Sequence, residues 1–186
     1  MMSIFHVLQS VGYFGFANWA PTLLEARGVT ITKSLGYLVA IGFSYPIAPI
    51  VISSIADRLE RKWQIIVGAL GAAVFGLLFA EQSSALGWIV FGILLSVSNI
   101  LMSIGFHAYQ SEIFPTHARA RAVGLVYSFS RLSTAFSGYL IAFVLQSSGV
   151  TGVFLTISAM LALAAFVIWI YGPRTDGKSL EDISPA

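Results

Sequence analysis

Long apolar runs separated by short polar connections dominate the chain. A bilayer core about 30 Å thick is crossed by about 20 helical residues. Each run must be helical, because unpaired backbone groups cannot face lipid. The pattern therefore predicts an all-α integral membrane protein with six transmembrane helices and a polar tail over 172–186. The predicted spans are about 4–24, 34–56, 63–80, 85–109, 122–145 and 152–171.

A break is expected inside the second span, where Pro46 and Pro49 each remove a backbone donor. Composition supports the lipid bilayer as the principal partner. Hydrophobic residues make up 57% of the chain and charged residues 10%, with a mean hydropathy of +0.85, beyond what a soluble domain of this size can bury. The ten basic residues are dispersed between apolar runs, which argues against nucleic-acid binding.

The basic residues alternate between the two sets of connections, seven in one set and two in the other. The positive-inside rule then predicts that both termini are cytoplasmic. We expect a bacterial inner membrane. The richer set is Arg58, Arg61, Lys62, Arg119, Arg121, Arg174 and Lys178, and the poorer set is Arg27 and Lys33.

Catalytic motifs are not matched. The string nearest to an intramembrane serine protease motif, Ala135 to Gly138, lacks the first glycine, and no His-Glu-x-x-His occurs. There are no cysteines, so thiolate metal sites are excluded. We therefore predict neither an enzyme nor a bound cofactor or metal.

Three connecting segments carry family marks. Ala56 to Lys62 reads Ala-Asp-Arg-Leu-Glu-Arg-Lys, Ser111 to Arg119 has Ser-Glu, two apolar residues, Pro and a later Arg, and Pro173 begins a charged tail. In this order the marks resemble the major facilitator superfamily, in its sugar-porter or metabolite:proton symporter branch. The resemblance implies the carboxy-terminal half of a twelve-helix transporter, helices 7 to 12, built as two inverted three-helix repeats.

The resemblance also implies that charges at the helix ends latch the bundle in one conformation. An Asp at a helix junction can cap free amides and pair with bases. A solvated turn is the equally open interpretation for the first loop taken alone. The expected latch residues are Asp57, Arg58, Arg61, Lys62, Glu112 and Arg119.

The first span keeps the sugar-porter spacing from Gln9 to Gly12 and Pro21, but hydroxyl-matching residues are replaced, with Phe14 where the family has an Asn. A hexose is therefore not the first choice of substrate. Polar stripes run along the fourth and fifth spans. Helix packing is the preferred interpretation for Ser96, Gly124 and Gly138. His6 and His107 are expected to be solvated at the membrane surface. The candidate substrate-binding residues are Gln9, Asn99, Ser103, Arg131 and Thr134.

Arg131 is the fixed charge deepest inside a span, and it needs a partner, water or a substrate. A substrate carboxylate is preferred, ahead of an acid from another half and of Glu112. The predicted function is secondary transport of a small organic anion by alternating access, with proton coupling implied by the resemblance. A porter of a sugar or another neutral metabolite, and a truncated non-transporting fragment or assembly partner, remain as alternatives. Since the chain begins directly before the seventh-helix motif, a separate amino-terminal half or a homodimer partner is expected.

Overall fold

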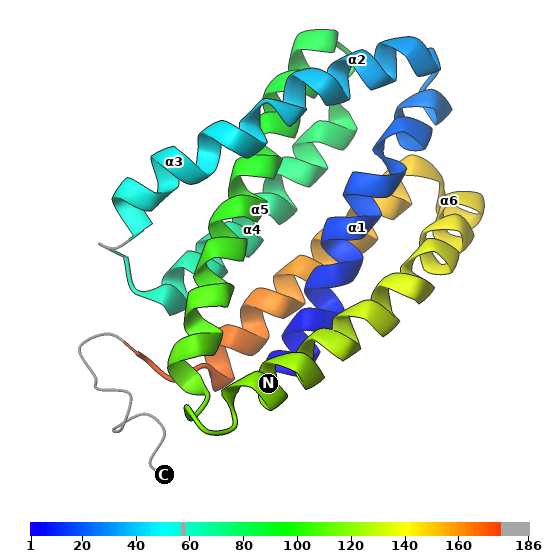
Figure 1. Cartoon of the computed structure of the whole chain (residues 1–186). Helices are drawn as coiled ribbons and strands as arrows, with labels where there is room; N and C mark the ends of the chain where they lie inside the picture. The colour runs from blue at the N-terminus through cyan, green and yellow to red at the C-terminus, as the bar shows by residue number, and fades with distance from the viewer. Residues whose placement is uncertain (57–58, 176–186) are drawn as a thin grey trace.

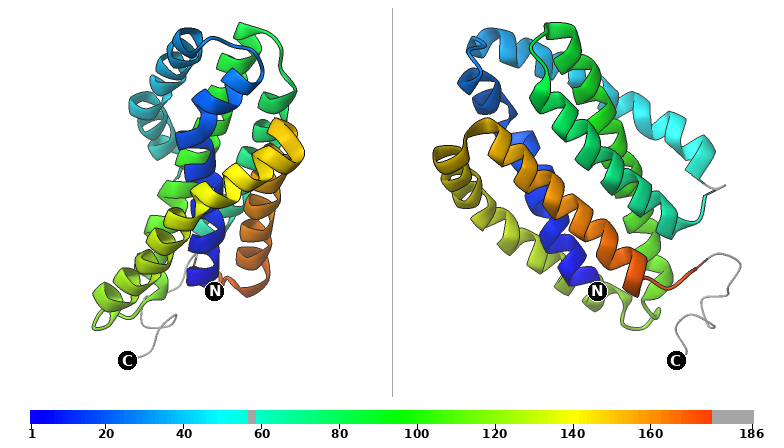
Figure 2. Two further views of the ribbon diagram at one scale, coloured as in Figure 1. Left: turned by 90° about the vertical axis from the view of Figure 1, so that its right-hand side faces the viewer. Right: turned by 180° about the vertical axis from the view of Figure 1, so that it is seen from behind.

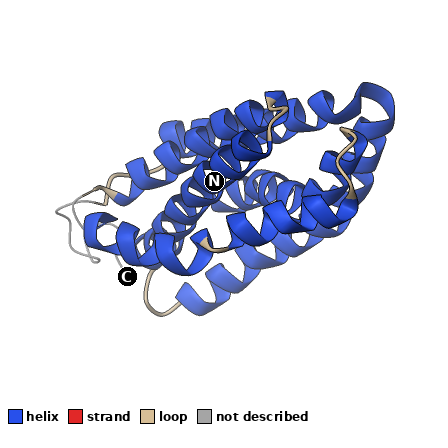
Figure 3. Ribbon diagram, turned by 90° about the horizontal axis from the view of Figure 1, so that it is seen from above, coloured by secondary structure: helices blue, strands red, loops and turns tan. Residues whose placement is uncertain are grey.

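The computed structural model describes residues 1–56 and 59–175, and in these ranges all the regular structure is helical (Figure 1 and Figure 3). This confirms the predicted all-α class. The elements are α1 (Met2–Ala26), α2 (Ile31–Gly42), α3 (Ser44–Ala56), α4 (Arg61–Glu81), α5 (Ala85–Ile113) and α6 (Arg119–Tyr171).

The break predicted near the two prolines lies at Phe43, between α2 and α3. Pro46 explains this place, because a proline clashes with the carbonyl four residues earlier and offers it no donor, and that carbonyl belongs to Gly42. At the same break, the Ser44 hydroxyl donates to the neighbouring carbonyl of Ile41 at 2.7 Å. Pro49 is accommodated within α3. The proline pair therefore divides one apolar run into two helices.

The element α6 is a helical hairpin of 53 residues, in which Gly149 has φ 68° and ψ −169°. Only glycine adopts this backbone conformation readily. Figure 1 and Figure 2 show the chain reversing there, so that the two arms of α6 run in opposite directions. The sequence predicts two spans, 122–145 and 152–171, at the positions of these arms.

Four helical segments of the described chain are long and apolar enough to cross a membrane: Ile31–Ser54, Arg61–Glu81, Ala85–Ile113 and Arg119–Tyr171. The first joins α2 and α3. The helix α1 has 25 residues but is not among the four, in keeping with its polar residues such as Gln9 and Asn18. Large apolar side chains lie on the outside, as at Ile50 and Tyr139, which fits a lipid environment and makes this an integral membrane protein.

The bundle interior is formed where glycines let helices approach closely. An added Cβ at Gly68 of α4 would lie 2.6 Å from the backbone nitrogen of Met102 in α5. At Gly12 of α1 it would lie 2.7 Å from Leu161, in the second arm of α6. Buried aromatic rings fill the space between these contacts, including an edge-to-face pair of Phe16 and Phe79 with centroids 5.3 Å apart.

Hydrogen bonds tie helix ends together at both ends of the bundle. At one end, Lys62 Nζ donates to the carbonyl of Gly172 at 2.7 Å, and the Tyr109 hydroxyl donates to that of Pro173 at 2.8 Å. At the other, Arg27 Nη2 donates to Thr151 Oγ1 at 3.0 Å. The start of α4 and the ends of α5 and α6 therefore share one end of the molecule.

Candidate functional site

A cavity of about 520 Å³ lies on one side of the bundle. Residues of α1, α3, α5 and the first arm of α6 form its wall. This volume is within the range of small-molecule sites. The lining residues are His6, Gln9, Tyr13, Phe14, Tyr45, Pro49, Asn99, Ile100, Ser103, Ile104, Phe106, His107, Tyr127, Ser130 and Arg131.

Four of the five candidate substrate-binding residues meet on this wall: Gln9, Asn99, Ser103 and Arg131. They come from three helices, so the tertiary fold brings them together. Thr134 is not a lining residue, and its Oγ1 donates to the carbonyl of Ser130 at 2.8 Å. The structure thus leaves Thr134 outside the cavity wall, with its hydroxyl bonded to its own helix backbone one turn earlier.

Arg131 carries the fixed positive charge of the cavity wall. It follows Arg119 by twelve residues, about 18 Å along the helix at 1.5 Å per residue. In the described part of the chain it makes no hydrogen bond or ion pair. Pairing with Glu112, the third interpretation above, does not occur, since Glu112 Oε1 lies 3.6 Å from Arg61 Nε. The guanidinium is thus available to a group that enters the cavity.

The two histidines on the wall were not predicted as part of the site. His6 is 1% exposed, so the expectation that it is solvated is wrong. Its Nε2 forms a hydrogen bond with the amide of Gln110, and its ring packs edge-on to Phe106 with centroids 5.0 Å apart. The burial arises because the first turn of α1 packs against the last turns of α5, a contact that hydropathy along one helix does not reveal.

His107 is held from two sides. Its Nδ1 lies 2.7 Å from the carbonyl oxygen of Ser103, and its Nε2 forms a hydrogen bond with the Tyr127 hydroxyl. The His107–Tyr127 bond joins α5 to the first arm of α6. Another polar contact joins α1 to the same arm, where the hydroxyl oxygens of Ser10 and Ser130 are 2.6 Å apart. In the sequence, the spacing of four residues between Ser103 and His107 was the signal that could have identified the contact between these two side chains.

Two glycines of the first α6 arm, Gly124 and Gly138, have no close neighbour among the described residues. An added Cβ at Gly124 or Gly138 would meet nothing within 4 Å. The helix packing predicted for these two glycines is therefore not made among the described residues. Ser96 does pack, being 2% exposed. The two glycines instead share this arm with exposed large side chains such as Phe136 and Phe143.

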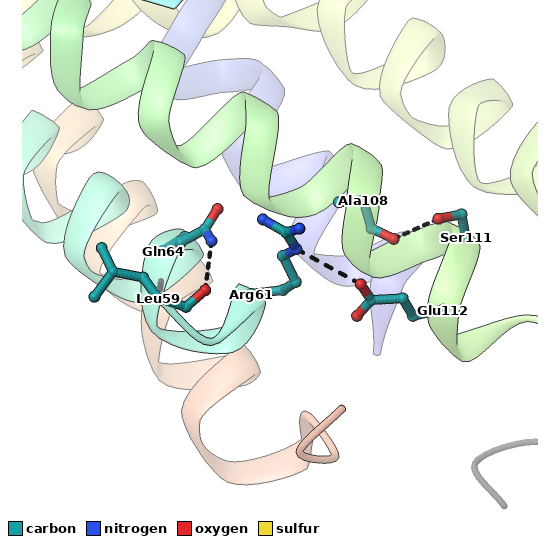
Figure 4. Close-up of polar contacts among 6 residues, drawn as sticks. All are labelled: Leu59, Arg61, Gln64, Ala108, Ser111 and Glu112. Carbon is teal, nitrogen blue, oxygen red and sulfur yellow. Dashed lines mark hydrogen bonds and ion pairs between the residues drawn. The ribbon is translucent and has the colours of Figure 1, made fainter. Parts of the chain in front are cut away.

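Four of the six predicted latch residues lie at one end of the bundle: Arg61, Lys62, Glu112 and Arg119. Figure 4 shows the Arg61 side chain at the start of α4 pointing toward Glu112 at the end of α5, with Arg61 Nε 3.6 Å from Glu112 Oε1. Lys62 bonds instead to the carbonyl of Gly172, as described above. Arg119 Nε donates to the carbonyl of Phe114 at 3.3 Å, which closes the turn before α6.

Asp57 and Arg58, the other two expected latch residues, lie outside the described residues. A contact between the first loop and Glu112 is nonetheless present through Arg61. The two side chains are 25% and 29% exposed and the paired atoms lie 3.6 Å apart, so water and salt still reach and screen this ion pair.

Comparison with known proteins gives a family match over nearly the whole chain. Residues 2–184 match the profile of the Major Facilitator Superfamily. YyaJ of Bacillus subtilis strain 168, a protein assigned to metabolite transport, is 31% identical over 180 residues, which cover 97% of this chain and 40% of YyaJ.

Two further relatives come from Acinetobacter baylyi strain ATCC 33305. The niacin transporter NiaP is 27% identical, covering 92% of this chain and 39% of its own length. The cis,cis-muconate transport protein is 31% identical, covering 76% of this chain and 34% of its own length. The chain therefore spans less than half the length of the curated relatives it matches.

Solved structures show the same fold. The proton:xylose symporter XylE, bound to 6-bromo-6-deoxy-D-glucose, has a TM-score of 0.75 and 23% identity, covering 98% of this chain and 41% of that one. An inward-open structure of XylE from E. coli has a TM-score of 0.64 and 25% identity. These likenesses concern the fold.

Proposed function

Because the chain belongs to the Major Facilitator Superfamily, a family of transporters and not of enzymes, we propose that it forms the carboxy-terminal half of a secondary transporter for a small organic anion. In this proposal its helices make six spans, with α1, the joined α2 and α3, α4, α5 and the two arms of α6 as one each. The half rocks against an amino-terminal half and exposes a central site to each side of the membrane in turn. Coverage of about 40% of YyaJ supports a half of such a protein.

The anionic substrate class is supported by Arg131, which lies on the cavity wall and has no hydrogen-bond acceptor among the described residues. A guanidinium in an apolar membrane environment costs free energy unless it is paired, and its planar donors match a carboxylate with two hydrogen bonds. Two relatives are named for niacin and cis,cis-muconate, both of which carry carboxylates. An anion that binds here would supply the negative charge that the described residues do not place beside Arg131.

The cavity is completed by a second half in this proposal. Gly124 and Gly138 leave open space beside the first arm of α6, and Tyr139 on the same arm is 77% exposed. Small residues of this kind let another helix approach closely. The second half comes from a longer chain, from a separate protein, or from a second copy of this chain as a homodimer.

Arg131 offers the direct test of the substrate class. The chain would be co-expressed with the amino-terminal half of YyaJ, and uptake of radiolabelled niacin, cis,cis-muconate and benzoate would be measured. Arg131→Gln should abolish uptake of an accepted anion, while Arg131→Lys, which keeps the charge without the planar pair of donors, should weaken it. Arg121→Gln, on the same helix but outside the cavity, is the matched control and should transport normally. Normal anion uptake by Arg131→Gln would contradict the proposal.

Sufficiency is tested with the purified chain alone in liposomes. We expect no saturable uptake, because polar stripes without a partner would face lipid. Robust saturable uptake by the chain alone would favour a homodimer over a two-protein assembly. Coupling to protons is part of the proposal and is measured in the same liposomes, containing both halves, as uptake driven by an imposed pH gradient.

The orientation is tested by cysteine labelling, since the chain has no cysteine of its own. We propose a bacterial inner membrane with both termini cytoplasmic. Single cysteines at His117 and Lys178 should react with an impermeant reagent only from the cytoplasm, and those at Val29 and Ser148 only from outside. Labelling of His117 and Val29 from the same side would overturn the six-span arrangement.

A further inference from the structure

A buried acceptor on the cavity wall has no donor among the described residues. Asn99 of α5 is 6% exposed, and its Nδ2 donates to the carbonyl of Leu95, one turn earlier, at 3.3 Å. Its Oδ1 is buried and has no hydrogen-bond partner within the described residues. Exchanging the two amide atoms would place Oδ1 against the carbonyl oxygen of Leu95, so the hydrogen bond fixes which atom is left free.

The oxygen of Asn99, unpaired among the described residues, indicates which chemical group a bound ligand must carry besides its carboxylate. Arg131, which lines the same cavity from α6, offers only donors. A carboxylate can therefore pair with Arg131 but cannot satisfy Asn99 Oδ1, because both are acceptors. A buried acceptor left unpaired weakens binding by about fivefold to about a hundredfold. A ligand that binds against this wall must bring its own donor to Oδ1, since no described residue supplies one.

We propose that the transported anion carries a hydrogen-bond donor, a hydroxyl or N–H group, that Asn99 Oδ1 accepts while the carboxylate binds Arg131. This inference rests on the proposed function and narrows its substrate class to hydroxy- or amino-substituted carboxylates. A site with a buried acceptor rejects an analogue that lacks the donor, since the acceptor is then left unpaired. Asn99 acts here as a specificity-determining residue.

Pairs of ligands that differ in whether they carry the hydrogen-bond donor test this inference. The chain, assembled with the amino-terminal half of YyaJ in lipid nanodiscs, would be titrated calorimetrically with 2-, 3- and 4-hydroxybenzoate and with the matching fluorobenzoates. Fluorine is close to a hydroxyl in size but donates no hydrogen bond. At least one hydroxybenzoate should bind about tenfold or more tightly than its fluoro partner. In Asn99→Leu this preference should fall below about twofold, chiefly through weaker binding of the hydroxy compound.

Ser96 provides the matched control. It lies one turn earlier on α5, is 2% exposed, and its Oγ also lacks a partner among the described residues, but it does not line the cavity. Ser96→Ala should keep the preference unchanged. Asn99→Ala replaces the leucine variant if that variant does not assemble.

The outcomes separate this inference from the proposed function. Equal binding of every hydroxy and fluoro pair, or a preference that survives in Asn99→Leu, overturns the inference, while loss of all binding in Arg131→Gln still supports the anion site. Carboxylate binding that is unchanged in Arg131→Gln overturns the proposed function. Failure of every benzoate to bind the wild-type assembly counts against both.

Discussion

Replacing Gly68 by alanine should separate α4 from α5 and destabilise the bundle. The added Cβ would lie 2.6 Å from the backbone nitrogen of Met102 and 2.8 Å from its Cα. These are backbone atoms, so no side-chain rotation can relieve the contact. One helix must move away from the other, and contacts along both are weakened.

The magnitude follows from overpacking, which costs about 1 to 3 kcal/mol when the surroundings cannot give way. Alanine also favours the helix over glycine by up to about 1 kcal/mol. A glycine in open space shows this second effect alone. Gly36 in α2 is such a position, because an added Cβ would meet nothing within 4 Å. Because this helix-propensity gain is common to both positions, the two alanine variants should differ by the overpacking cost alone, about 1 to 3 kcal/mol in free energy of unfolding.

The assay is reversible unfolding in mixed micelles of dodecyl maltoside and SDS, followed by far-UV circular dichroism and tryptophan fluorescence. Gly68→Ala should unfold at a lower SDS fraction than the wild-type chain, and Gly36→Ala at the same or a higher fraction. Gly71→Ala tests the geometric argument further, since its closest contact, at 2.8 Å, is the side-chain oxygen of Ser98, which can rotate away. The decrease in free energy of unfolding caused by Gly71→Ala should be smaller than that caused by Gly68→Ala. Equal stability of the Gly68 and Gly36 variants would refute the close helix approach.

Three further changes test polar and backbone features. Ser10→Ala should cost about 1 kcal/mol of stability, near the value of interhelical hydrogen bonds in membranes, since it removes the buried 2.6 Å contact with Ser130; an unchanged unfolding curve would contradict that contact. A double-mutant cycle of Arg61→Gln and Glu112→Gln should give a coupling below about 1 kcal/mol that shrinks at high salt, and a larger, salt-independent value would contradict an exposed pair. Gly149→Ala should cost about 1 to 3 kcal/mol in the same unfolding assay, because φ is positive there, and a stabilised variant would argue against the turn.

The helices and their breaks follow closely from local sequence. Apolar run length predicts the position of α4, with bounds that differ by only a few residues. The proline pair predicts the division between α2 and α3, and the break falls where the carbonyl opposite Pro46 loses its donor. These features are predictable because each depends on residues within about one turn of the position concerned.

The site is less predictable, and the individual residues show why. Helical periodicity places Asn99 and Ser103 on one face of α5, and both line the cavity. Thr134, predicted for the same site, does not line the cavity and bonds to its own helix. The burial of His6 depends on Gln110, which is 104 residues away in the chain. No local pattern connects two such positions.

The sequence by itself determined the membrane environment, the helices, the family and the presence of one arginine far from the helix ends, because hydropathy, proline chemistry and loop motifs act over short stretches. Only the tertiary structure decided which polar groups share a cavity, that Glu112 faces Arg61 and not Arg131, and that Asn99 Oδ1 has no donor among the described residues. The physical reason is that hydrogen bonding and burial depend on the distance between helices. That distance is fixed by glycine contacts such as Gly68 with Met102, between residues far apart along the chain.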